Sequence, residues 1–117
     1  MWEIIFTDTF REWLRAQDNK LKKRIAAALL NLQHYGPLLP RPYADTVNGS
    51  RFHNMKELRI QYAGQPIRAL YAFNTQRKAV ILCAGNKSGD KQFYARMICL
   101  ADQLFTAYLN NAEENHS

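Results

Sequence analysis

Three short β-type segments follow one another closely in the second half of the chain, and this spacing restricts the fold more than any other feature. Residues 57–62 alternate polar and apolar side chains, and residues 67–73 and 79–85 follow after turns at 63–66 and 74–77. Because side chains of a strand point alternately to its two faces, the first segment is expected to bury one face and expose the other. Turns this short join antiparallel neighbours, so the three segments predict a β-meander.

The N-terminal part of the chain predicts a strand followed by a helical hairpin. Residues 2–6 are rich in β-forming side chains, and Thr9 followed by Glu12 has the form of a capping box that opens a helix. Asp18 or Asn19 is expected to cap a second helix, whose apolar residues recur at helical spacing until a Gly-Pro pair ends it. Two helices joined this tightly are expected to pack together on a sheet.

The C-terminal part predicts one more helix, which Asp90 can cap. The order strand-helix-helix-strand-strand-strand-helix indicates an α+β domain, with a small antiparallel sheet of about four strands, an N-terminal α-hairpin and a C-terminal helix. We expect one domain over residues 1–110 and a polar, disordered tail over 111–117. Helices are expected to cover one face of the sheet and to leave the other face open for function.

Positive charge is concentrated in one segment of the 117 residues, whose formal net charge is +6. Residues 50–91 hold eight Lys and Arg against two acidic residues, a net of +6, whereas residues 1–49 carry +2 and residues 92–117 carry −2. A basic segment of this kind indicates a polyanionic partner such as nucleic acid. The alternative is a solvated basic surface without a partner.

The sequence lacks the signals that are typical of several classes of protein. There is no apolar run long enough for a membrane span and no basic-then-apolar leader at the start, so we expect a cytoplasmic protein without a membrane partner. Cys83 and Cys99 stand without metal-binding spacing, and Cys83 lies in an apolar run where a thiol serves as a core residue. The histidines are scattered at positions 34, 53 and 116. We therefore expect neither a metal site nor a small-molecule cofactor.

Cationic side chains on the predicted meander are the best candidates for chemistry. Glu57 and Arg59 share a face of their strand, and pairing through the 63–66 turn would bring Arg59 close to Arg68. Lys87 follows the third strand of the meander, and Tyr94 lies near the start of the last helix. Because clustered cations repel one another, such a group indicates an anion between them. Arginines that merely line a solvated face are the alternative.

The same motifs resemble a known family. They are Glu57-Leu58-Arg59, the segment Ile67-Arg68-Ala69-Leu70-Tyr71, and Gly85–Lys91 leading into Phe93-Tyr94. Taken in this order, and over nearly the whole chain, they look like the RelE/ParE toxin superfamily. Within it, the chain is most similar to the phage-associated HigB-like branch of type II toxin–antitoxin systems. The order of helices and strands is also that of the superfamily.

The resemblance implies a toxin that enters the ribosomal A site and cleaves messenger RNA by attack of a ribose 2′-OH, without a metal. By position, Arg59, Arg68, Lys87 and Tyr94 match basic and tyrosine residues of the family. We expect the two arginines to bind the phosphate, Lys87 to transfer a proton and Tyr94 to orient the nucleotide. The resemblance also implies a cognate antitoxin that carries a DNA-binding domain. Among the remaining basic side chains, we expect RNA contacts from Arg51, His53, Lys56 and Lys91.

Departures from the family pattern leave the roles open. Lys87 stands where relatives often have Arg, and some HigB-like relatives use His and Asp, for which His53 and Asp90 are candidates. A ParE-like inhibitor of DNA gyrase and a non-catalytic RNA-binding module are the alternative functions. The nuclease interpretation requires Arg59, Arg68 and Lys87 to converge on one open surface without being tied to acidic neighbours.

Overall fold

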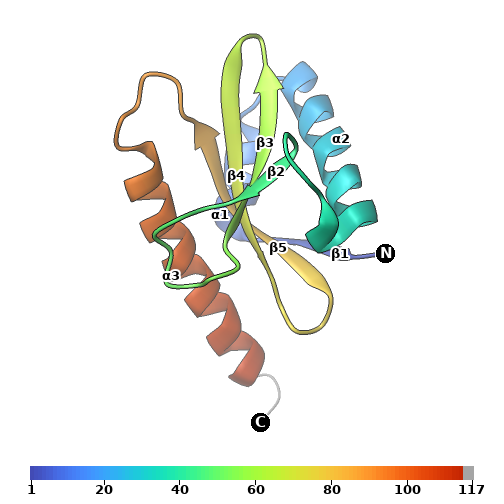
Figure 1. The fold of residues 1–117 in the computed structure, drawn as a ribbon, viewed down its shortest axis with the longest axis vertical. Coiled ribbons are helices and arrows are strands. Elements are labelled where there is room, and N and C mark those ends of the chain that lie inside the picture. Colours follow the sequence, from blue (N-terminus) through green and yellow to red (C-terminus); the bar gives the residue numbers. More distant parts are fainter. Residues whose placement is uncertain (115–117) are drawn as a thin grey trace.

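A computed structural model describes residues 1–114 as a five-stranded sheet with helices on both faces (Figure 1). In chain order the elements are β1 (Glu3–Phe6), α1 (Asp8–Arg15), α2 (Asn19–Tyr35), the 3-10 turn η1 (Gly36–Leu38), β2 (Ala44–Thr46), β3 (Lys56–Tyr62), β4 (Gln65–Phe73), β5 (Lys78–Asn86) and α3 (Phe93–Glu114). The strands lie in the order β1-β5-β4-β3-β2. Within these residues, no helix combines the length and the apolar character needed to cross a bilayer.

The α+β class, the helical hairpin, the antiparallel meander and the C-terminal helix are confirmed. The strand count differs slightly, because the short edge strand β2 pairs with β3 in a segment where no strand was expected. The sheet is also mixed, since β1 runs parallel to β5. Helix α3 continues through residues 111–114, where the sequence predicts a tail, and residues 115–117 lie outside the described residues.

Side-chain caps define where the two N-terminal helices begin. The hydroxyl of Thr7, not that of Thr9, caps α1 by accepting a hydrogen bond from the Phe10 amide at 3.1 Å. The same hydroxyl donates to the carbonyl of Leu82 on β5, which anchors the start of α1 to the sheet. The Asp18 carboxylate caps α2 through the Leu21 amide at 2.8 Å, as the sequence predicts.

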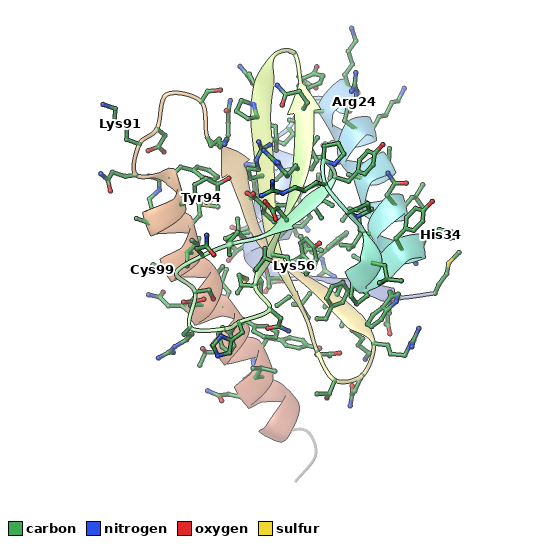
Figure 2. All side chains as sticks on the ribbon, viewed as in Figure 1. Arg24, His34, Lys56, Lys91, Tyr94 and Cys99 are labelled. Atoms are coloured by element: carbon green, nitrogen blue, oxygen red, sulfur yellow. The ribbon has the colours of Figure 1, made fainter. Side chains whose placement is uncertain are left out.

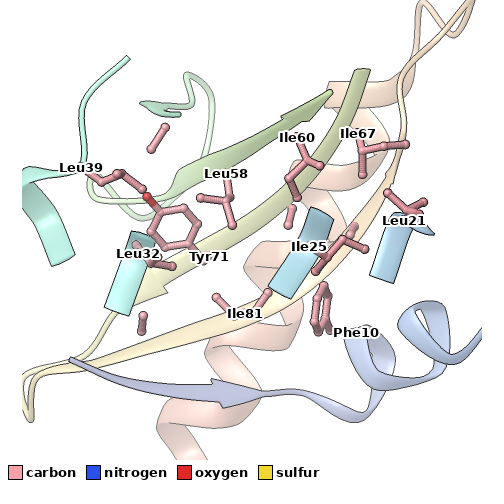
Figure 3. Packing of buried hydrophobic residues seen from close by; sticks show 14 residues of the cluster. Phe10, Leu21, Ile25, Leu32, Leu39, Leu58, Ile60, Ile67, Tyr71 and Ile81 are labelled. Carbon is pink, nitrogen blue, oxygen red and sulfur yellow. The ribbon is translucent and has the colours of Figure 1, made fainter. Parts of the chain in front are cut away.

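One hydrophobic core lies between the helical hairpin and the sheet (Figure 3). Phe10 of α1 and Ile25 and Leu32 of α2 pack there against inward-facing residues of β3, β4 and β5, among them Leu58 and Ile81. All five side chains are almost fully removed from water. Burial of each such side chain stabilises the fold by roughly 1.5–3 kcal/mol before entropy is counted.

A second core lies on the opposite face of the sheet, under α3. Phe93, Ala101 and Phe105 pack there against residues of β4 and β5 that include Leu70 and Leu82. The expectation that helices cover one face only was therefore wrong. The physical reason is that β4 and β5 are apolar on both faces over most of their length, whereas β3 alternates with polar side chains, and α3 packs on β4 and β5.

The cysteines are placed as the sequence indicates. Cys83 is buried in the second core, and burial raises the pKa of its thiol to about 12. The thiol of Cys83 is therefore protonated at neutral pH and serves as a small core residue. Cys99 is exposed on α3 (Figure 2).

Tyr71 gives a direct test of the first core. Its ring is fully buried, its hydroxyl lies beside Leu39 (Figure 3), and none of the described residues accepts or donates a hydrogen bond to it. Because a buried hydroxyl without a partner is destabilising, Tyr71→Phe is expected to raise the free energy of unfolding by about 1 kcal/mol. Urea denaturation measures this change.

The control is Tyr62→Phe. The hydroxyl of Tyr62 lies 3.2 Å from the exposed Asp18 carboxylate. That change is expected to stay within about 0.5 kcal/mol of the unaltered protein. A loss of more than about 1 kcal/mol for Tyr71→Phe would contradict the packing described, because it would mean that the hydroxyl has a bonding partner.

Candidate functional site

A tight hairpin between β3 and β4 sets the geometry of the site. Ala63 and Gly64 adopt positive φ angles of 52° and 76°, which form a two-residue turn between the paired ends of the two strands. The resulting register places Arg59 directly opposite Arg68. Residues directly opposite in antiparallel strands share a face, so the two guanidinium groups lie on the same side of the sheet, as the alternation predicts.

Arg68 is buried, with 5% of its surface exposed. Its Nη1 donates a hydrogen bond to the carbonyl of Ile67 at 3.0 Å, and its Nε lies 3.6 Å from Oε1 of Glu57. None of the described residues accepts a hydrogen bond from this Nε. A buried cation is costly unless it is paired and hydrogen-bonded, so Arg68 is only partly satisfied by the protein itself.

Glu57 connects Arg68 to the last helix. Glu57 is 6% exposed, and its Oε1 accepts a hydrogen bond of 2.6 Å from the hydroxyl of Tyr94. Burial and this hydrogen bond to a carboxylate raise the pKa of Tyr94, while the charge of Arg68 opposes the shift. Figure 2 shows Tyr94 directed from α3 toward the sheet. The phenol is therefore protonated at neutral pH and held against Glu57.

Lys87 joins the cluster from the end of β5. Its backbone amide donates to the carbonyl of Pro66 at 3.0 Å, and its Nζ lies 5.4 Å from the centre of the Tyr94 ring. Gly85, which lies opposite Arg68, allows α3 to start this close to the sheet, because a Cβ there would lie 3.1 Å from the Phe93 ring. The four residues predicted as catalytic thus come from four neighbouring parts of the fold: β3, β4, the end of β5 and the start of α3.

Arg59 lies in a different electrostatic environment from Arg68. It is half-buried, and its side chain makes no ion pair with any of the described residues. Asp45 on β2, which lies opposite Glu57, already pairs with Arg41 at 2.6 Å. The hydrogen bond from Arg41 holds the pKa of Asp45 below its usual value. The charge of Arg59 lowers the pKa of Asp45 as well, but Arg41 holds the hydrogen bond and the ion pair with Asp45, so the guanidinium of Arg59 can still bind another anion.

The expected convergence of free cations holds only in part. Arg59, Arg68 and Lys87 lie together, but Arg68 is tied to Glu57, which the sequence interpretation did not assign to the site. One carboxylate against three cations leaves a net charge of +2 in the cluster. Glu57 could have been found from its i, i+2 relation to Arg59, which places it on the same face and diagonally across from Arg68.

The other residues predicted to bind RNA do not join this cluster. The amide of Arg51 donates to the carboxylate of Asp102 on α3 at 3.0 Å. Lys56 begins β3 and, by alternation, points to the opposite face from Glu57. His53 is exposed between β2 and β3, and Lys91 is exposed ahead of α3 (Figure 2).

Asp90, the alternative acidic candidate, is engaged elsewhere. Its carboxylate pairs with Arg96 at 2.6 Å and accepts a hydrogen bond from the Gln92 amide just ahead of α3. The guanidinium of Arg96 lowers the pKa of Asp90. Among the side chains that the structure describes, no group of three or more His, Cys, Asp or Glu is arranged to hold a metal ion.

Two hollows meet the cluster. Arg59 and Arg68 line a groove of about 450 Å³ between α2 and β3. Glu57 and Tyr94 line a smaller cleft of about 290 Å³ beside β2 and α3. Two guanidinium groups facing one another suit the forked recognition of phosphate oxygens, and a carboxylate and a phenol lie directly next to them.

Comparison with solved structures defines the class of fold. The structure is similar to the archaeal RelE–RelB complex from Pyrococcus horikoshii OT3, with a TM-score of 0.56 and 13% sequence identity. The similarity covers 75% of this chain and 97% of that chain. The fold is therefore RelE-like.

Comparison of sequences shows the family. Residues 12–106 match the model of the family described as phage-derived protein Gp49-like (DUF891), and the chain belongs to this family. Two proteins of Mycobacterium tuberculosis (strain ATCC 25618 / H37Rv) that are named as toxins, HigB2 and HigB3, are each 41% identical to it. The match covers 87% of this chain and 52% of HigB2, and 86% of this chain and 87% of HigB3. The chain thus spans about half the length of HigB2. The resemblance to the HigB-like branch of the RelE superfamily is confirmed.

A double-mutant cycle tests the buried pair. Glu57→Gln is expected to lower the free energy of unfolding by about 3 kcal/mol, because it leaves the buried charge of Arg68 without compensation. Glu57→Gln combined with Arg68→Gln is expected to cost at least about 1 kcal/mol less than the sum of the single changes. The matched control is Glu3→Gln, which removes the more exposed Glu3–Lys78 pair at 3.8 Å and is expected to cost at most about 1 kcal/mol. Additive single changes would contradict the pairing.

The pKa of Tyr94 is expected to fall in Glu57→Gln, because the carboxylate that favours the protonated phenol is gone. A tyrosine whose pKa is raised in the folded state stabilises the fold at pH values below its unfolded pKa of about 10. This stabilisation is lost as the pH rises through the folded pKa. Ultraviolet titration of Tyr94, assigned by difference from Tyr94→Phe, measures both proteins. An unchanged Tyr94 pKa in Glu57→Gln would show that the hydrogen bond is not formed.

Proposed function

We propose that this protein is the toxin of a type II toxin–antitoxin pair, a metal-free endoribonuclease that cleaves messenger RNA in the cytoplasm. The observation that carries the proposal is the placement of Arg59 directly opposite the buried, partly satisfied Arg68. Two like charges this close are unfavourable unless an anion lies between them. Membership in the Gp49-like family, together with relatives named as toxins, supports the same function.

The reaction that suits this site is attack of a ribose 2′-OH on the adjacent phosphate. A bond forms between the 2′ oxygen and phosphorus as the 2′-OH gives up its proton, and the bond to the 5′ oxygen breaks as that oxygen takes up a proton. The products are a 2′,3′-cyclic phosphate and a 5′-OH end. Arg59 and Arg68 hold the non-bridging oxygens and stabilise the charge that develops on them, each by about 2–4 kcal/mol. Their position on two paired strands aligns the phosphate for in-line attack.

Proton transfer and positioning fall to the neighbours of the two arginines. We assign proton transfer to Lys87, whose ammonium lies at the edge of the cluster beside the Tyr94 ring. Tyr94 offers a ring for stacking on a base, and its hydrogen bond to Glu57 holds that ring in place. Glu57 acts as a positioning residue, because it contacts both Arg68 and Tyr94.

The proposal includes protein and RNA partners. An antitoxin with a DNA-binding domain neutralises the cationic cluster, and the RelE-like protein of Pyrococcus horikoshii OT3 was solved as a complex with RelB. The messenger RNA is cut on the ribosome. Arg51, His53, Lys56 and Lys91 make RNA contacts outside the cluster.

Substitution of Arg59 is the sharpest test, because this side chain is half-buried and its loss leaves the core intact. Arg59→Ala is expected to lower mRNA cleavage at least about 100-fold, and Arg59→Lys to restore only part of it, since lysine cannot fork onto two oxygens. Growth arrest on induction and primer extension on cellular mRNA are the measurements. The control is Lys20→Ala on α2, an exposed cation outside the cluster, which is expected to behave like the unaltered protein.

Three outcomes would contradict the nuclease. Full cleavage by Arg59→Ala would show that the cluster is not the site. Inhibition of gyrase supercoiling without new mRNA ends would indicate a ParE-like inhibitor. Salt-sensitive RNA binding without cleavage or growth arrest would indicate a binding module.

A further inference from the structure

The groove between α2 and β3 extends beyond the cluster that the proposed reaction uses. Its volume is about 450 Å³, within the range of about 300–1,000 Å³ typical of sites for small ligands. Its inner end is formed by Arg59 and Arg68, and the rest of its lining comes from α2, from the segment ahead of β2 and from the edge of β3. The polar and aromatic lining residues are Arg24, Asn31, Tyr43, Arg59, Gln61 and Arg68.

The groove exists because β2 covers only part of the edge of β3. The β2–β3 ladder ends where Ala44 lies opposite Leu58, and one further bond joins the Arg59 amide to the Tyr43 carbonyl at 2.8 Å. Beyond that point, no strand within the described residues covers the edge of β3. Opposite this edge α2 presents the small residues at positions 27 and 28, which leave the space open.

The charge in the groove is of one sign. Arg24, Arg59 and Arg68 line it, and none of its lining residues within the described part of the chain is acidic. Glu57, which pairs with Arg68, lines the cleft on the other side. The groove therefore attracts an anion along its whole length.

Arg68 gives a second indication of a ligand. Its side chain is at least nine-tenths buried and lines the groove, and its Nε, which lies 3.6 Å from the Glu57 carboxylate, has no hydrogen-bond partner among the described residues. An unpartnered donor on a buried cation costs free energy that a bound anion would recover. The inner end of the groove is thus suited to a phosphate.

Tyr43 suits the groove to a base as well as to phosphates. Its side chain is 51% exposed, although its backbone is fixed by hydrogen bonds to the Pro40 carbonyl and the Arg59 amide. A ring that is exposed on a fixed backbone is a typical stacking platform for an unpaired base. The amide of Asn31 adds a donor and an acceptor that suit the edge of a base.

We propose that the α2–β3 groove binds the nucleotide of single-stranded RNA that adjoins the scissile phosphate. Arg59 and Arg68 hold that phosphate, Tyr43 stacks on the neighbouring base, and Arg24 contacts the next phosphate. Asn31 contributes to base preference. This inference rests on the proposed nuclease function and adds to it a binding subsite on the side of the cluster away from α3. An acidic segment of a protein partner would match the charge, but it would leave the aromatic ring and the amide without a role.

The experiment measures RNA binding by variants and their matched controls. The probe is a short, fluorescently labelled RNA with 2′-O-methyl groups, which binds but lacks the attacking hydroxyl. Tyr43→Ala is compared with Tyr35→Ala, because both tyrosines are 51% exposed and only Tyr43 lines the groove. Arg24→Ala is compared with Lys23→Ala, an exposed cation next to it on α2.

Tyr43→Ala and Arg24→Ala are each expected to raise the Kd for this RNA about tenfold, and the two controls to stay within about twofold. Arg24→Ala is also expected to reduce the salt dependence of binding by about one counterion, because it removes one phosphate contact. Cleavage of messenger RNA by the unaltered protein, measured in a reconstituted translation reaction, shows whether the nuclease function itself holds.

The outcomes separate the two proposals. If the unaltered protein binds and cleaves RNA while Tyr43→Ala and Arg24→Ala bind as tightly as their controls, the subsite is wrong and the nuclease stands. If these variants bind RNA normally but lose affinity for the antitoxin, the groove belongs to a protein segment and the inference is overturned. If the folded, unaltered protein neither binds nor cleaves RNA, both proposals fail together.

Discussion

The buried guanidinium of Arg68 is the interaction on which the rest of the site depends. It lies opposite a second arginine, Arg59, and a single carboxylate, that of Glu57, compensates it. Such an arrangement is under strain in the protein alone, since like charges oppose one another across the strands and one buried donor is unused. A phosphodiester between the two arginines would remove both penalties, which is why this face suits a nucleic-acid backbone.

Local patterns were sufficient to predict most of the fold. The meander and the helical hairpin could be predicted because short turns and helical periodicity act over a few residues, and Asp18 caps its helix as expected. Features that depend on contacts between distant parts of the sequence could not be predicted in this way. Strand β2 forms only because its segment returns to the edge of β3, and the parallel pairing of β1 with β5 joins segments about 75 residues apart. To predict that α3 covers the second face of the sheet, one would have had to recognise that β4 and β5 are apolar on both faces.

The site, like the fold, was predictable where it depends on local patterns and not where it depends on distant contacts. Alternation and turn length were enough to place Arg59 opposite Arg68, because both depend only on the hairpin. The role of Glu57 was missed, because the hairpin register places it diagonally across from Arg68 but does not show that its carboxylate also accepts a hydrogen bond from Tyr94 on α3. Charge counting likewise placed Arg51 in the same basic segment as Arg59 and Arg68, whereas in the fold its backbone amide donates to the Asp102 carboxylate. Strand register is therefore a better guide to which residues share a site than membership in the same basic segment of the sequence.

The central claim is that Arg68 and Arg59 together bind a phosphodiester. Nuclear magnetic resonance of the arginine side chains tests it most directly, because the Nε–H group of Arg68 is buried and without a partner among the described residues. On titration with a 2′-O-methyl dinucleotide, the account predicts that the Nε–H resonances of Arg68 and Arg59 shift together along one saturating binding curve. Saturable binding of the dinucleotide with both resonances unmoved would contradict it.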